Sequence, residues 1–416
     1  MRARTAPCDP PHPEMRRFAA VLACITALVT APVLAEDAPA GAVPEQGDAY
    51  QARFLLGVEA LHAGNPMRAV VIFEQLLAET GSPRVQLELA RALFLMQDYE
   101  RAEQLFREVL ARPELPWRVA ENIRVYLDEI DMATGYIKFS VGMVSDSNPR
   151  NFTNSREVMI GGQTLQVVEP EDNREVYGAR LSVRGYRPLD DKRRTTAFFT
   201  ASYSDFPAHT FDRLTGDVGL AQAVPGLSWL KAKAGFEGAR LDGHTLYRFP
   251  YVGALAAMAP SEGSRLLGEF KFGRLQVPQM PHLDSHNLFL IGKLAYPPAL
   301  GLAFSNEATL EKAKADEAAY SYRGGSLGGS MVWPSATWDT RFTLYGSAGV
   351  RRYQGIDPFF GDRREDTRYV ASLDLLRPSL RFGGYRPQIG VMYEKTDSTL
   401  DFYSFSKVGL RFQLES

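Results

Sequence analysis

The chain has 416 residues, a net charge of −2 and 45% hydrophobic residues. This length favours two domains, and the near-neutral charge argues against a nucleic-acid partner. A mean hydropathy of −0.21 is too low for a bundle of membrane-spanning helices.

Residues 1–35 have the pattern of a secretory signal peptide. Two arginines come first, followed by an apolar run over 18–29 and a small-residue cleavage site at Val33 and Ala35. An N-terminal membrane anchor is the alternative, but the apolar run is short and a proline interrupts its end. Because Met15 is a good start for this segment, we expect that the residues before it come from an over-extended start.

Both cysteines, Cys8 and Cys24, lie before the expected cleavage site. The mature chain then has none, which excludes a disulfide framework, a cysteine zinc site and a cysteine nucleophile. No other segment approaches the roughly 20 apolar residues of a membrane-spanning helix. A membrane domain would therefore have to be a closed barrel, the only other structure that satisfies every backbone group in lipid.

Residues 36–48 are rich in proline, glycine and charge, which predicts a linker. Over residues 49–134 the apolar positions recur with helical spacing. A set of them repeats after 33 residues, since Ala69, Phe73, Leu77 and Pro83 recur as Ala102, Phe106, Leu110 and Pro116. This repeat predicts two units like tetratricopeptide repeats (TPR), followed by a capping helix. A plain helical bundle is the alternative.

From Gly135 onward, apolar residues alternate with polar ones. The pattern is clearest over 231–239, 302–311, 339–350 and 407–415. A period of two with one apolar and one polar face is typical of membrane strands with lipid outside and water inside. Prolines in predicted turns recur at steps of 35 to 37 residues, at Pro188, Pro225, Pro260, Pro297 and Pro334.

Longer polar loops lie between these turns. Counting the strands that these turns and loops separate gives 14. We therefore expect an antiparallel transmembrane β-barrel over residues 135–416. An even strand number places both ends of the barrel on one side of the membrane, with short turns there and longer loops outside. A soluble β-sandwich is the alternative, which the strand length and the aromatic strand ends disfavour. The expected fold class is thus a TPR-like α-helical domain followed by a 14-stranded membrane β-barrel.

Two short motifs near the ends of the predicted barrel carry a family resemblance. The first strand ends in Asp146-Ser147-Asn148, and a later stretch contains Phe360, Arg364 and Asp366 in a Phe-x-x-x-Arg-x-Asp pattern. Together with residues 384–393, they resemble the surface lipoprotein assembly modulators, the Slam family, also described as a type XI secretion system. That family joins a periplasmic TPR domain to a 14-stranded barrel. The present chain departs from it in its short helical domain.

The resemblance implies an outer-membrane translocator of Gram-negative bacteria, with its helical domain in the periplasm. Such a protein delivers a lipoprotein or a secreted protein from the periplasm to the cell surface. Its partners would be this client, outer-membrane lipid and, as further candidates, periplasmic chaperones. The alternatives are a passive porin with a helical tether, a polysaccharide-export barrel and, most distantly, a membrane hydrolase.

No catalytic pattern stands out, so we expect no enzyme, no cofactor and no metal. The glycine-rich segment 324–330 resembles a phosphate loop superficially, but it lies in a strand pattern, where glycine makes room for a neighbour. His282, Asp284 and His286 invite a metal interpretation, yet they lie in a predicted loop with no further soft ligand.

Six residues are candidate client contacts: Arg84, Arg91, Asp146, Asn148, Arg364 and Asp366. Arg84 and Arg91 would point into the TPR groove, a kind of surface that binds extended peptides, with solvated surface arginines as the alternative. For Asp146 and Asn148, local turn bonds at the start of an external loop are the favoured interpretation. For Arg364 and Asp366, a structural ion pair is favoured over a client contact.

Overall fold

The computed structural model describes residues 45–112, 115–160, 162–190, 192, 194–261, 263–335, 337–378, 380 and 385–415. The expected signal peptide, with Met15, Cys8 and Cys24, lies outside the described residues, as does most of the expected linker. The predicted domain limits therefore stay predictions.

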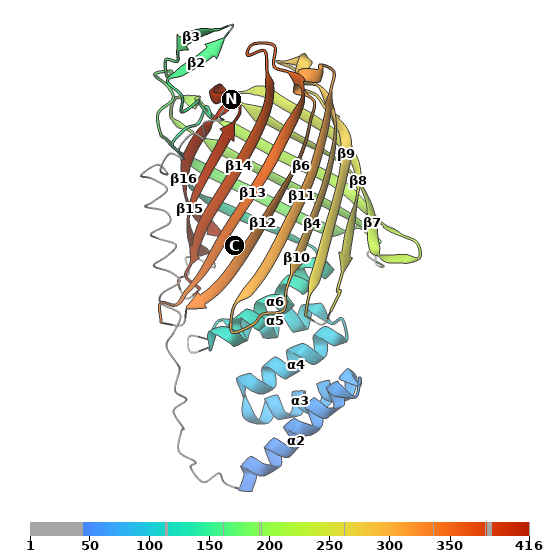
Figure 1. The fold of residues 1–416 in the computed structure, drawn as a ribbon. Helices are drawn as coiled ribbons and strands as arrows, with labels where there is room; N and C mark the ends of the chain where they lie inside the picture. The colour runs from blue at the N-terminus through green and yellow to red at the C-terminus, as the bar shows by residue number, and fades with distance from the viewer. Residues whose placement is uncertain are drawn as a thin grey trace, which may run out of the picture. The chain divides into compact units, whose positions relative to one another are not determined.

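Five helices precede the strands in the described part of the chain (Figure 1). They are α2 (Glu45–His62), α3 (Pro66–Thr80), α4 (Pro83–Leu95), α5 (Tyr99–Leu110) and α6 (Trp117–Thr134). Helices α3 and α4 both begin at a proline, whose fixed φ suits the first helical position. Gly81 ends α3 in the left-handed conformation, at φ 59°, which glycine adopts without strain.

The 33-residue repeat marks equivalent buried positions in these helices. Phe73 in α3 is 0% exposed and Phe106 in α5 is 1% exposed. A Cβ added at Gly57 would lie 2.6 Å from the Phe73 ring, so a small residue is needed where these helices meet. The Phe106 ring stacks on Tyr126 of α6, with centroids 5.0 Å apart. The predicted TPR-like stacking with a final capping helix is confirmed.

Fourteen antiparallel strands close into a barrel, which confirms the predicted fold class (Figure 1). Each strand pairs with the barrel strands before and after it, and the last pairs with the first. The strands are β1 (Tyr136–Asp146), β4 (Val176–Pro188), β5 (Thr195–Asp205), β6 (Arg213–Val224), β7 (Leu227–Leu241), β8 (His244–Met258), β9 (Arg265–Leu275), β10 (Ser285–Ala295), β11 (Ala303–Ala315), β12 (Tyr322–Ser335), β13 (Thr340–Ile356), β14 (Arg363–Leu376), β15 (Arg386–Ser398) and β16 (Phe405–Glu415).

The connections differ from the sequence expectation at four places. The long connection after β1 contains a separate hairpin, β2 (Glu157–Ile160) with β3 (Gln163–Gln166). The expected loop between β7 and β8 is a two-residue turn at Asp242 and Gly243, both with positive φ, as tight hairpin turns require. Pro188 and Pro334 lie in the last residues of β4 and β12 rather than in turns.

Large apolar side chains cover the outward face of the barrel. Examples with their exposed fractions are Met143 60%, Leu181 54%, Val252 58%, Leu310 58% and Leu327 71%. An apolar surface of this extent is stable against lipid rather than water. The closed ladders pair the strand backbone groups internally, as a lipid environment demands. None of the described helices has the length and hydropathy of a membrane span.

Replacing Phe73 by alanine should lower the free energy of unfolding of the helical region by about 3–5 kcal/mol, because a cavity remains in its core. Thermal unfolding of the helical signal, followed by circular dichroism on the purified full chain, measures this. Val71→Ala on the same helix is the matched control. Val71 is 52% exposed, so its replacement should cost about 0.5 kcal/mol or less. Equal losses in the two variants would contradict the assigned core.

Candidate functional site

The inward side chains of β10 to β16 line a cavity of ≈ 550 Å³ inside the barrel. Glu307, Thr309 and Glu311 of β11 are among them, as their alternation with apolar residues predicts. The other charged residues of the lining are Arg351, Arg364, Asp366, Arg368 and Glu394. The barrel interior is therefore a polar space with both signs of charge.

An ion pair crosses β12 inside the barrel. The Arg351 guanidinium on β13 donates two hydrogen bonds to Glu311 on β11, at 3.0 and 2.9 Å. Two parallel bonds of this kind fix the orientation of both groups. A Cβ on Gly324 of β12 would lie 2.7 Å from Glu311 Oε1, so a side chain there would obstruct the pair. Segment 324–330 thus makes room for a neighbour within a strand, as predicted.

Arg364 and Asp366 form the ion pair that the sequence analysis favours. Arg364 Nη2 lies 2.7 Å from Asp366 Oδ2, and Asp366 is buried. The same guanidinium lies over the ring of Tyr403, 3.6 Å from its centroid, and faces Tyr353 at 4.7 Å. A desolvated cation over an aromatic face adds to the stability of the pair.

Phe360, the first residue of the Phe-x-x-x-Arg-x-Asp motif, joins two loops at this end of the barrel. Its ring contacts Phe402 and Tyr403, both at centroid distances of 5.7 Å. The Tyr403 hydroxyl donates a hydrogen bond of 2.8 Å to Asp357. Burial, together with this acceptor, raises the pKa of Tyr403, so its hydroxyl stays protonated and donating. The motif therefore fixes the loops after β13 and β15 to β14.

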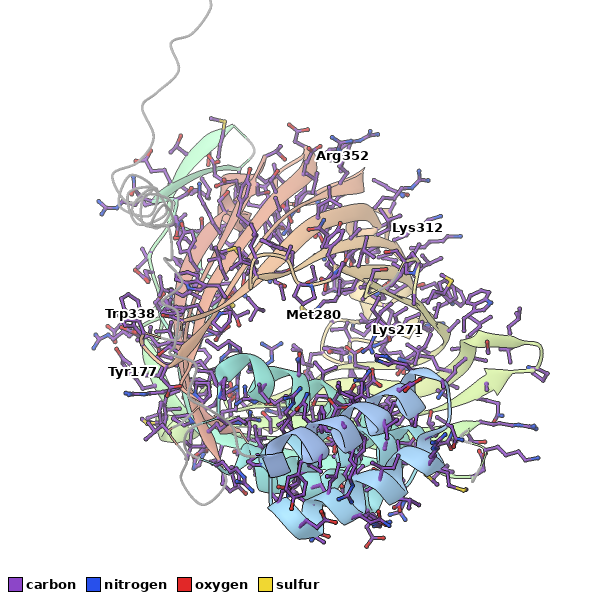
Figure 2. The ribbon with its side chains drawn as sticks, turned by 90° about the horizontal axis from the view of Figure 1, so that it is seen from below. Tyr177, Lys271, Met280, Lys312, Trp338 and Arg352 are labelled. Carbon is purple, nitrogen blue, oxygen red and sulfur yellow. The ribbon has the colours of Figure 1, made fainter. Side chains whose placement is uncertain are left out.

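The opposite wall, on β6 to β9, holds a second charged network around Lys271, which is labelled in Figure 2. Lys271 Nζ lies 3.1 Å from Glu237 and 3.3 Å from Asp217. Lys233 Nζ lies 2.6 Å from Glu269. Tyr251 donates a 2.7 Å hydrogen bond to Asp217, and its ring centroid lies 4.8 Å from each ammonium group.

This network was not among the six candidate residues. The alternating pattern of residues 231–239 predicts that Lys233 and Glu237 lie on the polar face of β7. It does not identify the residues on other strands with which they pair. Asp217 and Lys271 are 54 positions apart in the sequence, and the pairing register across four strands is what brings them together. Removing one member of a buried charge network is costly, because the remaining charges lose their partners.

Asp146 and Asn148 form the turn bonds that the sequence analysis favours. The Asn148 backbone N–H donates to Asp146 Oδ1 at 2.9 Å, and Asn148 Oδ1 accepts from the Phe152 backbone N–H at 2.7 Å. Asn148 also reaches the far end of the chain, since its Nδ2 donates to the Ser406 carbonyl at 3.2 Å. The sequence analysis missed this second role and the serines beside it, Ser145 and Ser147.

Arg84 and Arg91 lie two turns apart on α4, outside its buried face. Arg91 pairs with Glu88 one turn before it, at 3.7 Å, and its side chain is 42% exposed. Exposed ion pairs of this kind contribute little to stability. The Arg91 side chain can therefore exchange Glu88 for another carboxylate at little cost. Whether this face contacts a client stays a prediction.

Of the three suspected metal residues, His282 and Asp284 serve loop structure, whereas His286 lies in β10 rather than in the predicted loop, with its ring stacked on Phe272. Asp284 accepts a 2.7 Å hydrogen bond from the Val277 backbone N–H, and the His282 ring packs against Tyr320. Among the described residues, three others could each offer a ligand atom within 4.8 Å of one another: Asp205, His209 and Asp212. The Phe206 backbone N–H already donates a hydrogen bond of 2.8 Å to Asp212 Oδ1, and this bond lowers the pKa of the Asp212 carboxyl. This group orders the loop after β5, and we assign no metal to it.

A closed barrel with an apolar belt and a charged lumen, preceded by periplasmic TPR-like helices, defines an outer-membrane β-barrel protein. Residues 60–113 match the tetratricopeptide repeat model. Residues 267–415, from within β9 to the end of β16, match the model of the surface lipoprotein assembly modifier family. The chain thus carries a surface lipoprotein assembly modifier domain, which confirms the resemblance drawn from its sequence. Domain and barrel point to an outer-membrane translocator rather than to catalysis.

Similar solved structures share the barrel at low identity. The outer-membrane protein OmpT of Vibrio cholerae, as a loop-deletion mutant, is 8% identical with a TM-score of 0.36 and covers 68% of this chain and 100% of its own. An anion-selective porin from Comamonas acidovorans is 9% identical, also at TM-score 0.36, with coverage of 68% and 100%. A bacterial polysaccharide outer-membrane secretin is 10% identical at TM-score 0.34, with coverage of 67% and 97%. These scores carry no functional argument. No curated protein matches the chain.

Replacing Lys271 by methionine should shift ion selectivity toward cations, because Asp217, Glu237 and Glu269 lose the ammonium group they share. The loss of these charge-assisted bonds should also lower stability by about 1–3 kcal/mol. The reversal potential across planar bilayers in a salt gradient measures the selectivity, and a semi-native gel on heating measures the stability. The control is Lys312→Met on the exposed outer end of β11 (Figure 2). Equal shifts in both variants would contradict the inward placement of Lys271.

Proposed function

We propose that this chain delivers a lipoprotein, or a secreted protein, from the periplasm to the cell surface. The observation that carries the proposal is the surface lipoprotein assembly modifier domain, which covers residues 267–415 of a closed barrel. The same chain bears TPR-like helices in the periplasm. A protein built only for passive diffusion has no need of a peptide-binding array beside its barrel.

The helical domain supplies the capture step. TPR-like helices stack so that one face forms an extended surface for peptides. Arg84 and Arg91 lie on the exposed side of α4, where guanidinium groups can bind carboxylates of an extended client segment. The client would thus be held close to the membrane in an unfolded or partly folded form.

The barrel supplies a polar route. Its lumen carries charges of both signs that are paired with one another, as in Arg351 with Glu311 and Lys233 with Glu269. Paired charges hold a passing polar chain less tightly than isolated charges would, because their fields largely cancel at a distance. The periplasm offers no nucleotide, so the driving force has to come from client folding at the surface, from partners or from chaperones.

Deleting the gene should remove a co-expressed client lipoprotein from the surface of intact cells, measured by antibody labelling before and after permeabilisation. The full chain supplied on a plasmid should restore it. Unchanged surface exposure on deletion would refute the proposal. If the protein is instead a passive porin, liposomes containing it should take up small solutes while deletion leaves every client in place.

Reversing the charge of Arg84 and Arg91 together should lower client surface exposure several-fold while leaving the barrel folded. The matched control reverses Arg68 on α3 and Arg107 on α5, two exposed arginines of the same domain. Co-purification of the client with each variant measures capture directly. An equal loss in both double variants would show that net charge, rather than the face of α4, is what matters.

A further inference from the structure

Among the residues that the structure describes, the ladder between the first and last strands is the shortest in the barrel. It joins Ser140–Val144 of β1 to Arg411–Glu415 of β16, five residue pairs. The next shortest ladder joins β8 to β9 over eight pairs, Tyr251–Met258 against Leu266–Gly273. Backbone pairing therefore opposes opening least at this seam, although side chains of the loop after β1 also cross it, as Asn148 does to Ser406 and Thr153 to Asp401.

Serine hydroxyls accept hydrogen bonds from β16 where the β1–β16 ladder stops. The Leu410 backbone N–H donates to Ser145 Oγ at 3.1 Å, and the Val408 backbone N–H donates to Ser147 Oγ at 2.8 Å. In a regular antiparallel ladder, both would donate to the carbonyls of those serines. Backbone bonds also run from the Ser147 N–H to the Val408 carbonyl at 3.0 Å and, just before β16, from the Asn154 N–H to the Ser404 carbonyl at 2.9 Å. Two serine hydroxyls thus cover the edge of β16 at its outer end.

Both sides of the seam are firmly attached to the rest of the barrel. Strand β1 pairs with β4 over eleven residues, Tyr136–Asp146. Strand β16 pairs with β15 over eleven residues, Phe405–Glu415. Val144 is buried in an apolar cluster with Phe206 and Phe211 of the loop after β5. Separation at this end therefore takes β1 away with β4 and leaves β16 with β15.

Lipid surroundings dictate what must follow such a separation. A hydroxyl leaves its partner by rotating about one side-chain bond, whereas the freed N–H groups of Val408 and Leu410 cannot stay unbonded in a membrane. They need a new acceptor, and the backbone of another extended chain supplies carbonyls at the required spacing.

We propose that the outer end of the β1–β16 seam opens sideways and that the Val408–Leu410 edge of β16 binds an extended strand of the translocated client. This inference rests on the proposed function. Val408 and Leu410 face lipid, while Lys407 faces the lumen, where it lies 3.5 Å from Asp146 of β1. Lys407 also donates to Asn151 Oδ1 at 2.9 Å and lies 3.9 Å from Glu394 of β15. When Asp146 leaves with β1, Lys407 keeps Glu394 and loses its nearer carboxylate, whose place a client carboxylate can take. The strand that fits has apolar residues on its lipid side and an acidic residue on its lumen side.

Locking the seam with a disulfide tests the proposal. The pair Ser145→Cys with Leu410→Cys joins β1 to β16 at the serine contact. The pair Met143→Cys with Phe412→Cys joins them one step further in and keeps both serines. Met143 and Phe412 are directly paired, and paired antiparallel residues lie within the Cα distance that a disulfide spans. The matched control, Leu344→Cys with Leu373→Cys, joins the paired lipid-facing residues of β13 and β14.

Client surface exposure on intact cells is measured for each variant after oxidation and again after reduction. The expected result is a loss of about tenfold or more on oxidation of either seam pair, restored by reduction, with no change in the control. If every oxidised variant exports its client like the wild type, the seam proposal is wrong while the proposed function stands. If even the wild type exports no client, the proposed function is wrong.

Hydrogen exchange on the purified barrel tests the seam without any client. The amides of Val408 and Leu410 should exchange at least about tenfold faster than those of Leu373 and Leu375 in β14. Replacing Ser145 and Ser147 by alanine should increase this difference. Replacing Ser182 and Ser202 by alanine should leave this difference unchanged. These two serines lie in the lumen, and their hydroxyls bond to each other. Equally slow exchange at both sets of amides would overturn the proposal, whatever the export assay shows.

Discussion

The need to pair every backbone N–H and carbonyl in lipid is the constraint on which the rest of this structure depends. It makes fourteen strands close into a ring, because any open edge would leave a row of unbonded groups in the membrane. It also explains the seam, where the Ser145 and Ser147 hydroxyls accept hydrogen bonds from N–H groups of β16 at the point where the ladder stops. Hydroxyls keep the ring sealed there with bonds that are easier to exchange than those of a continuous ladder.

Inside the closed ring, the charged side chains are only partly surrounded by water, so they need partners among the other side chains of the lumen. The two lumen walls solve this with ion pairs that reach across strands, such as Glu311 with Arg351 over Gly324. Gly324 of β12 is therefore needed for this ion pair, although it carries no charge. Aromatic rings such as Tyr251 and Tyr403 fill the remaining space beside the cations.

Local patterns in the sequence predict most of the fold and little of the candidate site. Alternation and turn spacing depend on neighbouring residues, so they give the strand number and place Glu311 and Lys233 inside. The 33-residue repeat likewise predicts the buried pair Phe73 and Phe106. Partners across strands are different, because Lys271 and Asp217 meet only through a register that no local pattern encodes. The serine contacts of the seam link residues more than 260 positions apart, and the β2–β3 hairpin lies in a segment without clear alternation.

The pairing of first and last strands also bears on how the protein is made. The ladder that closes the ring joins residues about 270 positions apart, from Ser140 with Glu415 to Val144 with Arg411. Contacts so distant form slowly, since the chain between them has to be ordered first. Until then, the lipid-facing side chains of a nearly complete sheet have no partner and invite aggregation. We therefore propose that the polypeptide is escorted through the periplasm before its ring closes, in the same way as the clients we propose for it.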